Sequence, residues 1–214
     1  MEFMTGKTEK KTVLISDILS GEYEGKEVLL NGAVHKIRDM GEVAFVVLRT
    51  REGLVQTVYE EGTTTPELKE LCEEAAVTVK GTVALEERAP QGFEIRAVSF
   101  EILSKPVEPM PIAINKWKMN TSLETKLDLR PLSLRNVKER AKFRVQEGIV
   151  RGFRDYLHSQ GFTEIHSPKI GARGAEGGAN LFRLEYFHKH AVLAQSPQFY
   201  KQMMVGVFDR VFEA

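Results

Sequence analysis

Polar side chains with complementary hydrogen-bonding roles gather in residues 195–202 of this chain. Ser196 can cap a helix and Pro197 suits a first helical turn, so the segment predicts a helix that begins there. Gln198 and Lys201 then share one face of that helix. An amide beside an ammonium suits a small dianionic amino acid, because the ammonium can pair with the side-chain carboxylate. A solvated surface helix explains the same residues, and the pattern alone favours it.

A second group of candidate residues, Arg38, Phe45 and Gln56, lies in the first half of the chain. An aromatic ring can stack on an unpaired base, and arginine and glutamine can read base edges through hydrogen bonds. Phe45 alternates with Val43 and Val47, however, and this pattern alone favours a place in a hydrophobic core. Both interpretations of Phe45 therefore stay open.

Five short strand-like runs, separated by turn-forming stretches, surround the second group. They are residues 28–34, 43–49, 54–59, 77–85 and 93–103. Between the third and fourth runs, Thr65 as N-cap and Pro66 at the first helical position predict a helix in residues 65–74. Five strands with a helix in this place predict an OB-fold β-barrel, whose second and third strands commonly face oligonucleotides. Another small barrel or a meander is the alternative.

A proline-rich joint follows the last strand. Pro106, Pro109 and Pro111 prevent a helix or a central strand from continuing, so the segment reads as a linker. Beyond it, apolar side chains at helical spacing predict one amphipathic helix over about residues 137–160, which Gly161 ends.

The composition is that of an ordinary soluble protein, with 42% hydrophobic and 28% charged residues. Lysine plus arginine equals aspartate plus glutamate at 30 each, so binding to nucleic acid depends on a local arrangement of side chains. Cys72 is the single cysteine, which fits a reducing compartment. No run approaches the roughly 18 apolar residues that span a bilayer. We expect a cytoplasmic protein without membrane contact and, because the histidines lack ligand spacing, without a metal site.

Residues 161–168 follow the predicted long helix and resemble the first signature motif of class II aminoacyl-tRNA synthetases. In that family the motif is a helix and a strand ending in an invariant proline at the dimer interface. The resemblance implies a homodimer in which Gly161 and Pro168 belong to the interface motif.

Residues 195–202 resemble the aspartate-recognition helix of the aspartyl-tRNA synthetases within that class. The resemblance implies that Gln198 binds the amino or carboxylate end of aspartate, that Ser196 shapes the same pocket, and that Lys201 holds the side-chain carboxylate. Glu176 matches the glutamate of a mobile loop that pairs with the substrate ammonium, although Ala175 replaces the usual threonine before it. The Glu-Gly-Gly form of this loop resembles the archaeal-type branch. Phe199 and Met203, one turn apart, predict a buried pair on the same helix.

The first half resembles the anticodon-binding OB domain of the same enzymes, through residues 32–41, Phe45 and Gln56. The resemblance implies that Phe45 stacks on the central anticodon uridine, that Gln56 hydrogen-bonds it, and that Arg38 contacts the neighbouring base or the backbone. Glu94 matches a carboxylate near the third anticodon base. Ala33 departs from the family, in which tryptophan is frequent at this position.

These resemblances imply an aspartate–tRNA ligase that activates L-aspartate with ATP and Mg²⁺ and transfers it to aspartate tRNA. Whether it also charges asparagine tRNA stays open. Residues 208–214 lead into the second class II motif before its arginine. We therefore expect a fragment of a longer protein, inactive alone, that binds neither ATP nor Mg²⁺ through the residues present. A non-catalytic tRNA-binding module and an asparaginyl-tRNA synthetase-like enzyme are the alternatives.

The expected organisation has four parts. A disordered or tag-like start covers residues 1–12, the OB-fold covers 13–104, the linker or hinge covers 105–136, and the incomplete start of an α+β catalytic domain covers 137–214. Apolar side chains of the last part would lack partners, so we expect it to be disordered, molten or self-associated, with a protease-resistant core ending near Lys105.

Overall fold

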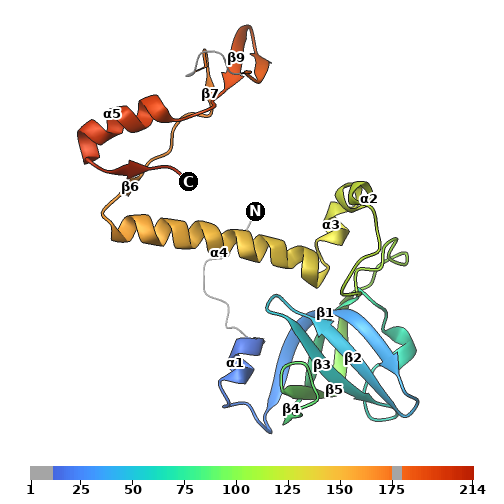
Figure 1. Cartoon of the computed structure of the whole chain (residues 1–214). Coiled ribbons are helices and arrows are strands. Elements are labelled where there is room, and N and C mark those ends of the chain that lie inside the picture. Colours follow the sequence, from blue (N-terminus) through green and yellow to red (C-terminus); the bar gives the residue numbers. More distant parts are fainter. Residues whose placement is uncertain (1–11, 175–179) are drawn as a thin grey trace, which may run out of the picture. The chain divides into compact units, whose positions relative to one another are not determined.

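The computed structural model describes residues 12–174 and 180–214 of the chain. The chain divides into two compact units, residues 1–140 and residues 141–214. The first unit contains a barrel and the segment that follows it, and the second contains most of the long helix and the elements after it (Figure 1). None of the helices in the described ranges is long and apolar enough to cross a membrane.

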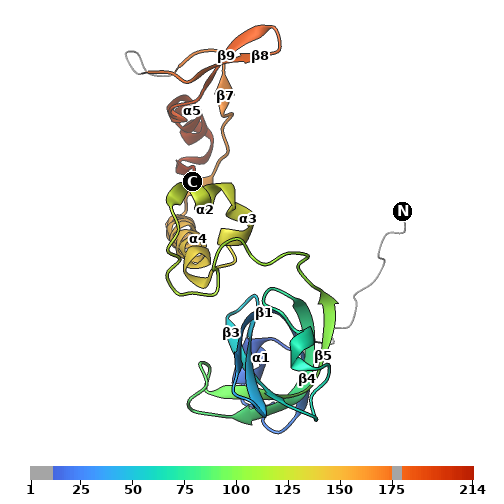
Figure 2. The ribbon, with the colours of Figure 1, turned by 90° about the vertical axis from the view of Figure 1, so that its right-hand side faces the viewer.

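A closed five-stranded barrel forms most of the first unit and confirms the predicted OB-fold. Its strands follow the spatial order β1-β2-β3-β5-β4, with β3 and β5 parallel and the other neighbours antiparallel. Figure 2 shows these strands curving around the closed barrel. Each predicted run lies within one strand: β1 (Glu27–Asp39), β2 (Val43–Arg49), β3 (Leu54–Glu60), β4 (Ala76–Leu85) and β5 (Phe93–Ser104).

The barrel core is built from alternate residues of the strands. In β2 the fully buried side chains are Ala44, Val46 and Leu48, which are 0% exposed. The short helix α1 (Ile15–Leu19) adds Ile15 and Ile18 to the same core. Burying an aliphatic side chain of this size stabilises the fold by about 1.5–3 kcal/mol. Core packing therefore fixes which face of each strand points outward.

The helix expected in residues 65–74 is much shorter than predicted. The structure has only the 3-10 helix η1 (Leu68–Glu70) in this connection. The backbone N–H of Thr65 donates to the carbonyl of Val98 at 3.2 Å, and the Thr65 carbonyl accepts from the N–H of Phe100 at 2.7 Å. The backbone of Thr65 therefore forms hydrogen bonds with β5 in the way that a strand residue does. It does not serve as a helix N-cap.

The segment expected as a linker has a small core of its own. Helices α2 (Leu123–Asp128) and α3 (Arg130–Ser133) lie in it. The buried hydrophobic residues of this core are Ile112, Ile114 and Met119. The first unit extends through this segment to residue 140.

The second unit begins within the long helix. Helix α4 (Val137–Ser159) confirms the predicted helix, and Gly161, with φ of 76°, ends it. The N–H groups of Gly161 and Phe162 donate to the carbonyls of His158 and Leu157, which is a Schellman motif. The remaining elements are β6 (Thr163–Glu164), β7 (Ile170–Gly171), β8 (Arg183–Tyr186), β9 (Lys189–Leu193), α5 (Gln198–Phe208) and β10 (Val211–Phe212).

Two details of the predicted α5 are wrong. Pro197 is the N-cap residue, since its carbonyl accepts the first helical hydrogen bond from the N–H of Lys201, so Ser196 lies one residue too early to cap the helix. Phe199 and Met203 are 59% and 58% exposed rather than buried. Helical spacing fixes which residues share a face, but it does not determine what covers that face.

Candidate nucleic-acid interface and amino-acid site

Phe45, Gln56 and Glu94 lie on the outer face of the barrel. Phe45 sits between the core residues Ala44 and Val46 and is only half-buried. Side chains alternate between the two faces of a strand, so Phe45 points away from the core. The ring therefore faces the outer surface of the barrel, where Arg38 lies over it.

The four residues predicted to read an anticodon are brought together from four strands. Arg38 of β1 pairs with Phe45 of β2, and Gln56 of β3 pairs with Glu94 of β5. Nη2 of Arg38 donates to Oε1 of Gln56 at 3.0 Å, and Nε2 of Gln56 donates to Oε2 of Glu94 at 3.1 Å. The guanidinium carbon of Arg38 lies 5.4 Å from the centre of the Phe45 ring.

Burial divides this group into an enclosed part and an exposed part. Gln56 and Glu94 are each 9% exposed, and their mutual hydrogen bond holds the amide in one orientation. Arg38 is exposed and covers the Phe45 ring. Rotation of Arg38 would uncover an aromatic stacking surface beside an oriented amide and carboxylate. Such a surface suits an unpaired base, which offers both a flat face and polar edges.

Two basic residues that sequence analysis did not single out lie on the same face. Lys36 pairs with Val47 and Arg96 pairs with Val58, and both cations are exposed. The register of β1 shifts between Val34 and Lys36, so residues on either side of the shift change faces. A strict alternation read from the sequence cannot locate that shift.

A buried ion-pair network lies at the end of β2. Both Nη atoms of Arg49 donate to the carboxylate of Glu74, at 2.5 and 2.7 Å, and Arg135 of the linker donates to it at 3.0 Å. Burial acts to raise the pKa of Glu74, but hydrogen bonds from Arg49 and Arg135 outweigh it, so the pKa lies below its ordinary value. Nδ1 of His35 lies 3.4 Å from Nη1 of Arg49. Burial, with the Arg49 charge, lowers the pKa of His35 below 6.5.

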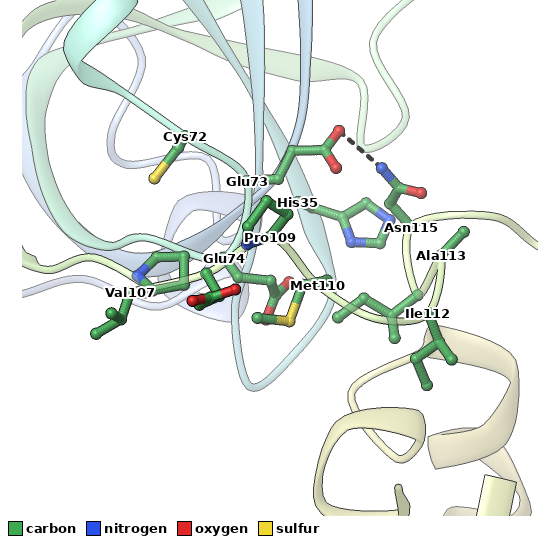
Figure 3. A pocket seen from close by; sticks show the side chains of 13 residues that line it. His35, Cys72, Glu73, Glu74, Val107, Pro109, Met110, Ile112, Ala113 and Asn115 are labelled. Atoms are coloured by element: carbon green, nitrogen blue, oxygen red, sulfur yellow. Dashed lines mark hydrogen bonds between the residues drawn. The ribbon is translucent and has the colours of Figure 1, made fainter. Parts of the chain in front are cut away.

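A cavity of about 480 Å³ lies between this network and the linker. Pro109, Met110 and Ile112 of the linker line it together with His35 and Glu74 (Figure 3). Nδ2 of Asn115 donates to Oε1 of Glu73 at 2.7 Å across the same contact (Figure 3). The linker is therefore tied to the barrel through side chains as well as through the chain itself.

In the second unit, the motif ending in Pro168 is held by a parallel strand pair. Strand β6 pairs with β10, with Thr163 opposite Val211. The backbone N–H and the hydroxyl of Ser167 donate to Glu213 at 2.9 and 2.7 Å, and the ammonium of Lys169 bonds the same carboxylate. Hydrogen bonds from Lys169 and Ser167 lower the pKa of Glu213 to about 2. Glu213 thus anchors both residues that flank Pro168.

The predicted aspartate-binding residues are only partly gathered. Ser196 lines a cavity of about 430 Å³ together with Pro168, Arg173 and Tyr200, whereas Gln198 and Lys201 are not among its lining residues. Gln198 is exposed and Lys201 half-buried in the first turn of α5. Glu176 lies outside the described residues. Sequence analysis did not single out Arg173, because no pattern connected it with Ser196.

Two families match successive parts of the chain. Residues 28–103 match the OB-fold nucleic acid binding domain, and residues 122–214 match the class II tRNA synthetases (D, K and N). The chain is 46% identical over 201 residues to the aspartate–tRNA(Asp/Asn) ligase of Thermus thermophilus, covering 94% of this chain and 46% of that protein. It is 48% identical over 192 residues to the ligase of the same name from Deinococcus radiodurans, covering 90% and 43%.

Solved structures are similar over nearly the same length. An asparaginyl-tRNA synthetase from Pyrococcus horikoshii, complexed with asparaginyl-adenylate, matches with a TM-score of 0.79 and 33% identity, covering 90% of this chain and 44% of that one. An asparaginyl-tRNA synthetase from Entamoeba histolytica matches with a TM-score of 0.75 and 25% identity, covering 91% and 45%. The chain spans less than half the length of the relatives it matches.

Proposed function

We propose that the chain belongs to an aspartate–tRNA ligase, because its successive parts match the OB-fold nucleic acid binding domain and the class II tRNA synthetases (D, K and N). The proposed reaction has two steps. The α-carboxylate of L-aspartate attacks the α-phosphate of ATP, forming aspartyl-adenylate and releasing pyrophosphate, and the aspartyl group then passes to tRNA with release of AMP. We further propose that the protein acts in the cytoplasm as a homodimer through the motif containing Gly161 and Pro168.

The observation that carries this proposal is the group on the outer face of the barrel. A half-buried aromatic ring and a hydrogen-bonded, buried amide and carboxylate lie beside one exposed arginine. In the proposed complex Phe45 stacks on the central anticodon base while Gln56 bonds its edge. Arg38 rotates away from the Phe45 ring toward the neighbouring base or phosphate. Glu94 keeps its hydrogen bond to Gln56 and lies near the third anticodon base.

Aspartate binding is proposed for residues at the start of α5 and before it. The ammonium of Lys201 pairs with the side-chain carboxylate of the substrate, and Gln198 and Ser196 bind its backbone end. Glu176 pairs with the substrate ammonium. A lysine in this position favours aspartate over asparagine, because the neutral amide of asparagine cannot form the same ion pair.

ATP and Mg²⁺ are proposed as co-substrate and cofactor of the longer protein. Magnesium supplies neutralisation of triphosphate charge when bound. Within the described ranges no three His, Cys, Asp or Glu side chains gather as a metal site, and we assign none of these residues to the ion. The residues of this chain would bind and orient aspartate and tRNA.

Replacement of Phe45 tests the proposed tRNA interface. Phe45→Ala should weaken binding of an aspartate anticodon stem-loop by ~1–3 kcal/mol, since the stacking surface is lost. Phe45→Leu is the matched control, because it keeps an apolar side chain but removes the aromatic face. Fluorescence anisotropy with a labelled stem-loop gives the Kd values, and thermal unfolding shows whether each variant stays folded. Unchanged affinity in a folded Phe45→Ala variant would contradict the proposed stacking.

An asparagine-charging enzyme is the second candidate, and the likeness to asparaginyl-tRNA synthetase structures favours keeping it. Amino-acid-dependent pyrophosphate exchange by the longer protein separates the two. Aspartate should support exchange and asparagine should not. Charging assays with purified aspartate and asparagine tRNAs then show which tRNAs accept the amino acid.

A further inference from the structure

Trp117 is the only tryptophan of the chain, and 73% of its surface is exposed. It lies in the linker between Lys116 and Lys118, which are also exposed. In the part of the chain that the structure describes, neither lysine takes part in a salt bridge. An exposed indole between two unpaired ammonium groups combines a flat stacking face with positive charge, which suits a ligand that has both aromatic rings and anionic groups.

The loop that carries Trp117 is held firmly at both ends. Ile114 and Met119 are buried in the small core of the linker, at 3% and 5% exposure. Nδ2 of the buried Asn136 donates to the carbonyls of Ile114 and Lys116, at 2.9 and 2.6 Å. The exposure of Trp117 is therefore imposed by the packing around it and does not result from a frayed segment. A partner meets an aromatic ring that is already in place, which reduces the entropy lost on binding.

The charge of the linker favours an anionic partner. Residues 105–140 contain eight lysines and arginines against four aspartates and glutamates, whereas the whole chain is balanced. The linker is docked at the Arg49 end of β2, through Glu74 and Arg135. Phe45 lies four residues earlier on the same strand, a distance of ~13 Å. An RNA bound on Phe45 can extend past the end of β2 toward the linker.

We propose that residues 116–118 form a second RNA-contact surface, which binds tRNA outside the anticodon stem-loop. The two lysines pair with backbone phosphates, and Trp117 stacks on an unpaired base. This inference rests on the proposed function, since tRNA is the ligand. A lipid surface would also attract lysines beside a tryptophan, but the base-binding face on the same unit favours RNA.

The intrinsic fluorescence of the 214-residue chain tests the contact, because its indole signal comes from Trp117 alone. Transcribed tRNA with the aspartate anticodon should quench this emission. The isolated anticodon stem-loop, shown to be bound by anisotropy of a labelled copy, should leave it unchanged. The proposal would be overturned if saturating tRNA caused no quenching, or if the stem-loop quenched the emission as strongly as tRNA does. It would also be overturned if anionic vesicles quenched the emission and tRNA did not. Failure of both RNAs to bind would overturn the proposed function together with this inference.

Substitutions give an independent measurement. Trp117→Ala should weaken tRNA binding about 5- to 150-fold, the effect of losing one stacked base. The double variant Lys116→Gln, Lys118→Gln should reduce the slope of log K against log salt by roughly 1.4–1.8. Val107→Ala and Lys105→Gln change one apolar and one basic residue that are exposed elsewhere in the linker, and they should leave tRNA binding unchanged. Stem-loop affinity should stay constant in every variant, and equal losses for tRNA and stem-loop would overturn the second surface.

Discussion

The carboxylate of Glu74 joins the barrel to the linker. Its side chain is 2% exposed and accepts hydrogen bonds from Arg49 of β2 and Arg135 of the linker. A buried carboxylate of this kind is stable only when it is paired, and removal of one partner leaves an uncompensated charge. Glu74 therefore contributes directly to holding the linker on the barrel.

His35, next to this network, should make the first unit sensitive to mild acid. Burial, the charges of Arg49 and Lys36, and the opposing charge of Glu74 leave its pKa below 6.5 in the folded state. The unfolded state then binds more protons in this range, so the free energy of unfolding should decrease as the pH falls below about 6.5. Urea unfolding between pH 7 and pH 5 measures the dependence.

His35→Gln is the control for this prediction, because it keeps a hydrogen-bond acceptor for Arg49 but does not titrate. The variant should lose most of the pH dependence above pH 5, where ordinary carboxylates remain ionised. An identical pH profile in wild type and variant would show that other groups cause it.

The direction of Phe45 illustrates what the sequence of a strand can and cannot predict. In β2 both sets of alternate residues are largely apolar, with Val43, Phe45 and Val47 on one face and Ala44 and Val46 on the other. Alternation locates the strand, but it cannot identify the inner face when both faces are apolar. Closure of the barrel decides between them. The candidate residues could be named from the resemblance, whereas the hydrogen bonds from Arg38 through Gln56 to Glu94 required the structure.

Asn136 connects the linker to the start of α4. Its Oδ1 accepts from the N–H groups of Lys138 and Glu139, which are free in the first turn of the helix, at 3.0 and 3.1 Å. Its Nδ2 donates to two linker carbonyls. One buried side chain therefore caps the helix and holds the loop before it.

Replacement of Asn136 should separate these two roles. Asn136→Ala should destabilise the first unit by about 2–4 kcal/mol, because both the cap and the bonds to the carbonyls are lost. Asn136→Asp keeps the acceptor that caps the helix but has no N–H donor. It should therefore be destabilised only by the loss of the hydrogen bonds to the carbonyls of Ile114 and Lys116. Chemical denaturation gives both values. Equal stability of Asn136→Ala and wild type would show that water replaces the side chain at no cost.

Local patterns predicted the strands and the long helix well, since the five strand-like runs and α4 all lie where periodicity placed them. The helix predicted in residues 65–74 failed for a tertiary reason. Thr65 has the local features of an N-cap, but its backbone pairs with β5, more than 30 residues later in the chain. A preference worth about 1 kcal/mol does not outweigh two strand hydrogen bonds and the closure of a barrel.

The linker belongs structurally with the barrel. Asn115 bonds Glu73, Arg135 bonds Glu74, and Arg140 donates to the carbonyl of Thr50 at 3.0 Å. Prolines in the sequence indicated an extended joint, but they could not show that the joint has a small core and polar contacts of its own. These contacts depend on residues up to 90 positions apart, which no local pattern connects.

Limited proteolysis should show this boundary. No residue of α4, whose residues are all described, is buried, so the helix beyond residue 140 should open easily. We expect a resistant fragment that ends near Arg140, identified by mass spectrometry. A core ending near Lys105, as the sequence alone predicts, would show that the linker contacts are too weak to protect it.

We propose that the outer face of the barrel reads an anticodon. The most direct test changes Gln56 together with the base that it is proposed to bind. The measurement is the Kd of wild type and of Gln56→Ala for stem-loops with uridine or cytidine at the central anticodon position. Wild type should prefer uridine by ~1–3 kcal/mol, the cost of leaving a buried polar group unpaired. Gln56→Ala, shown to be folded by thermal unfolding, should bind both stem-loops equally. The same preference for uridine in the variant, or no preference in wild type, would contradict the proposed recognition.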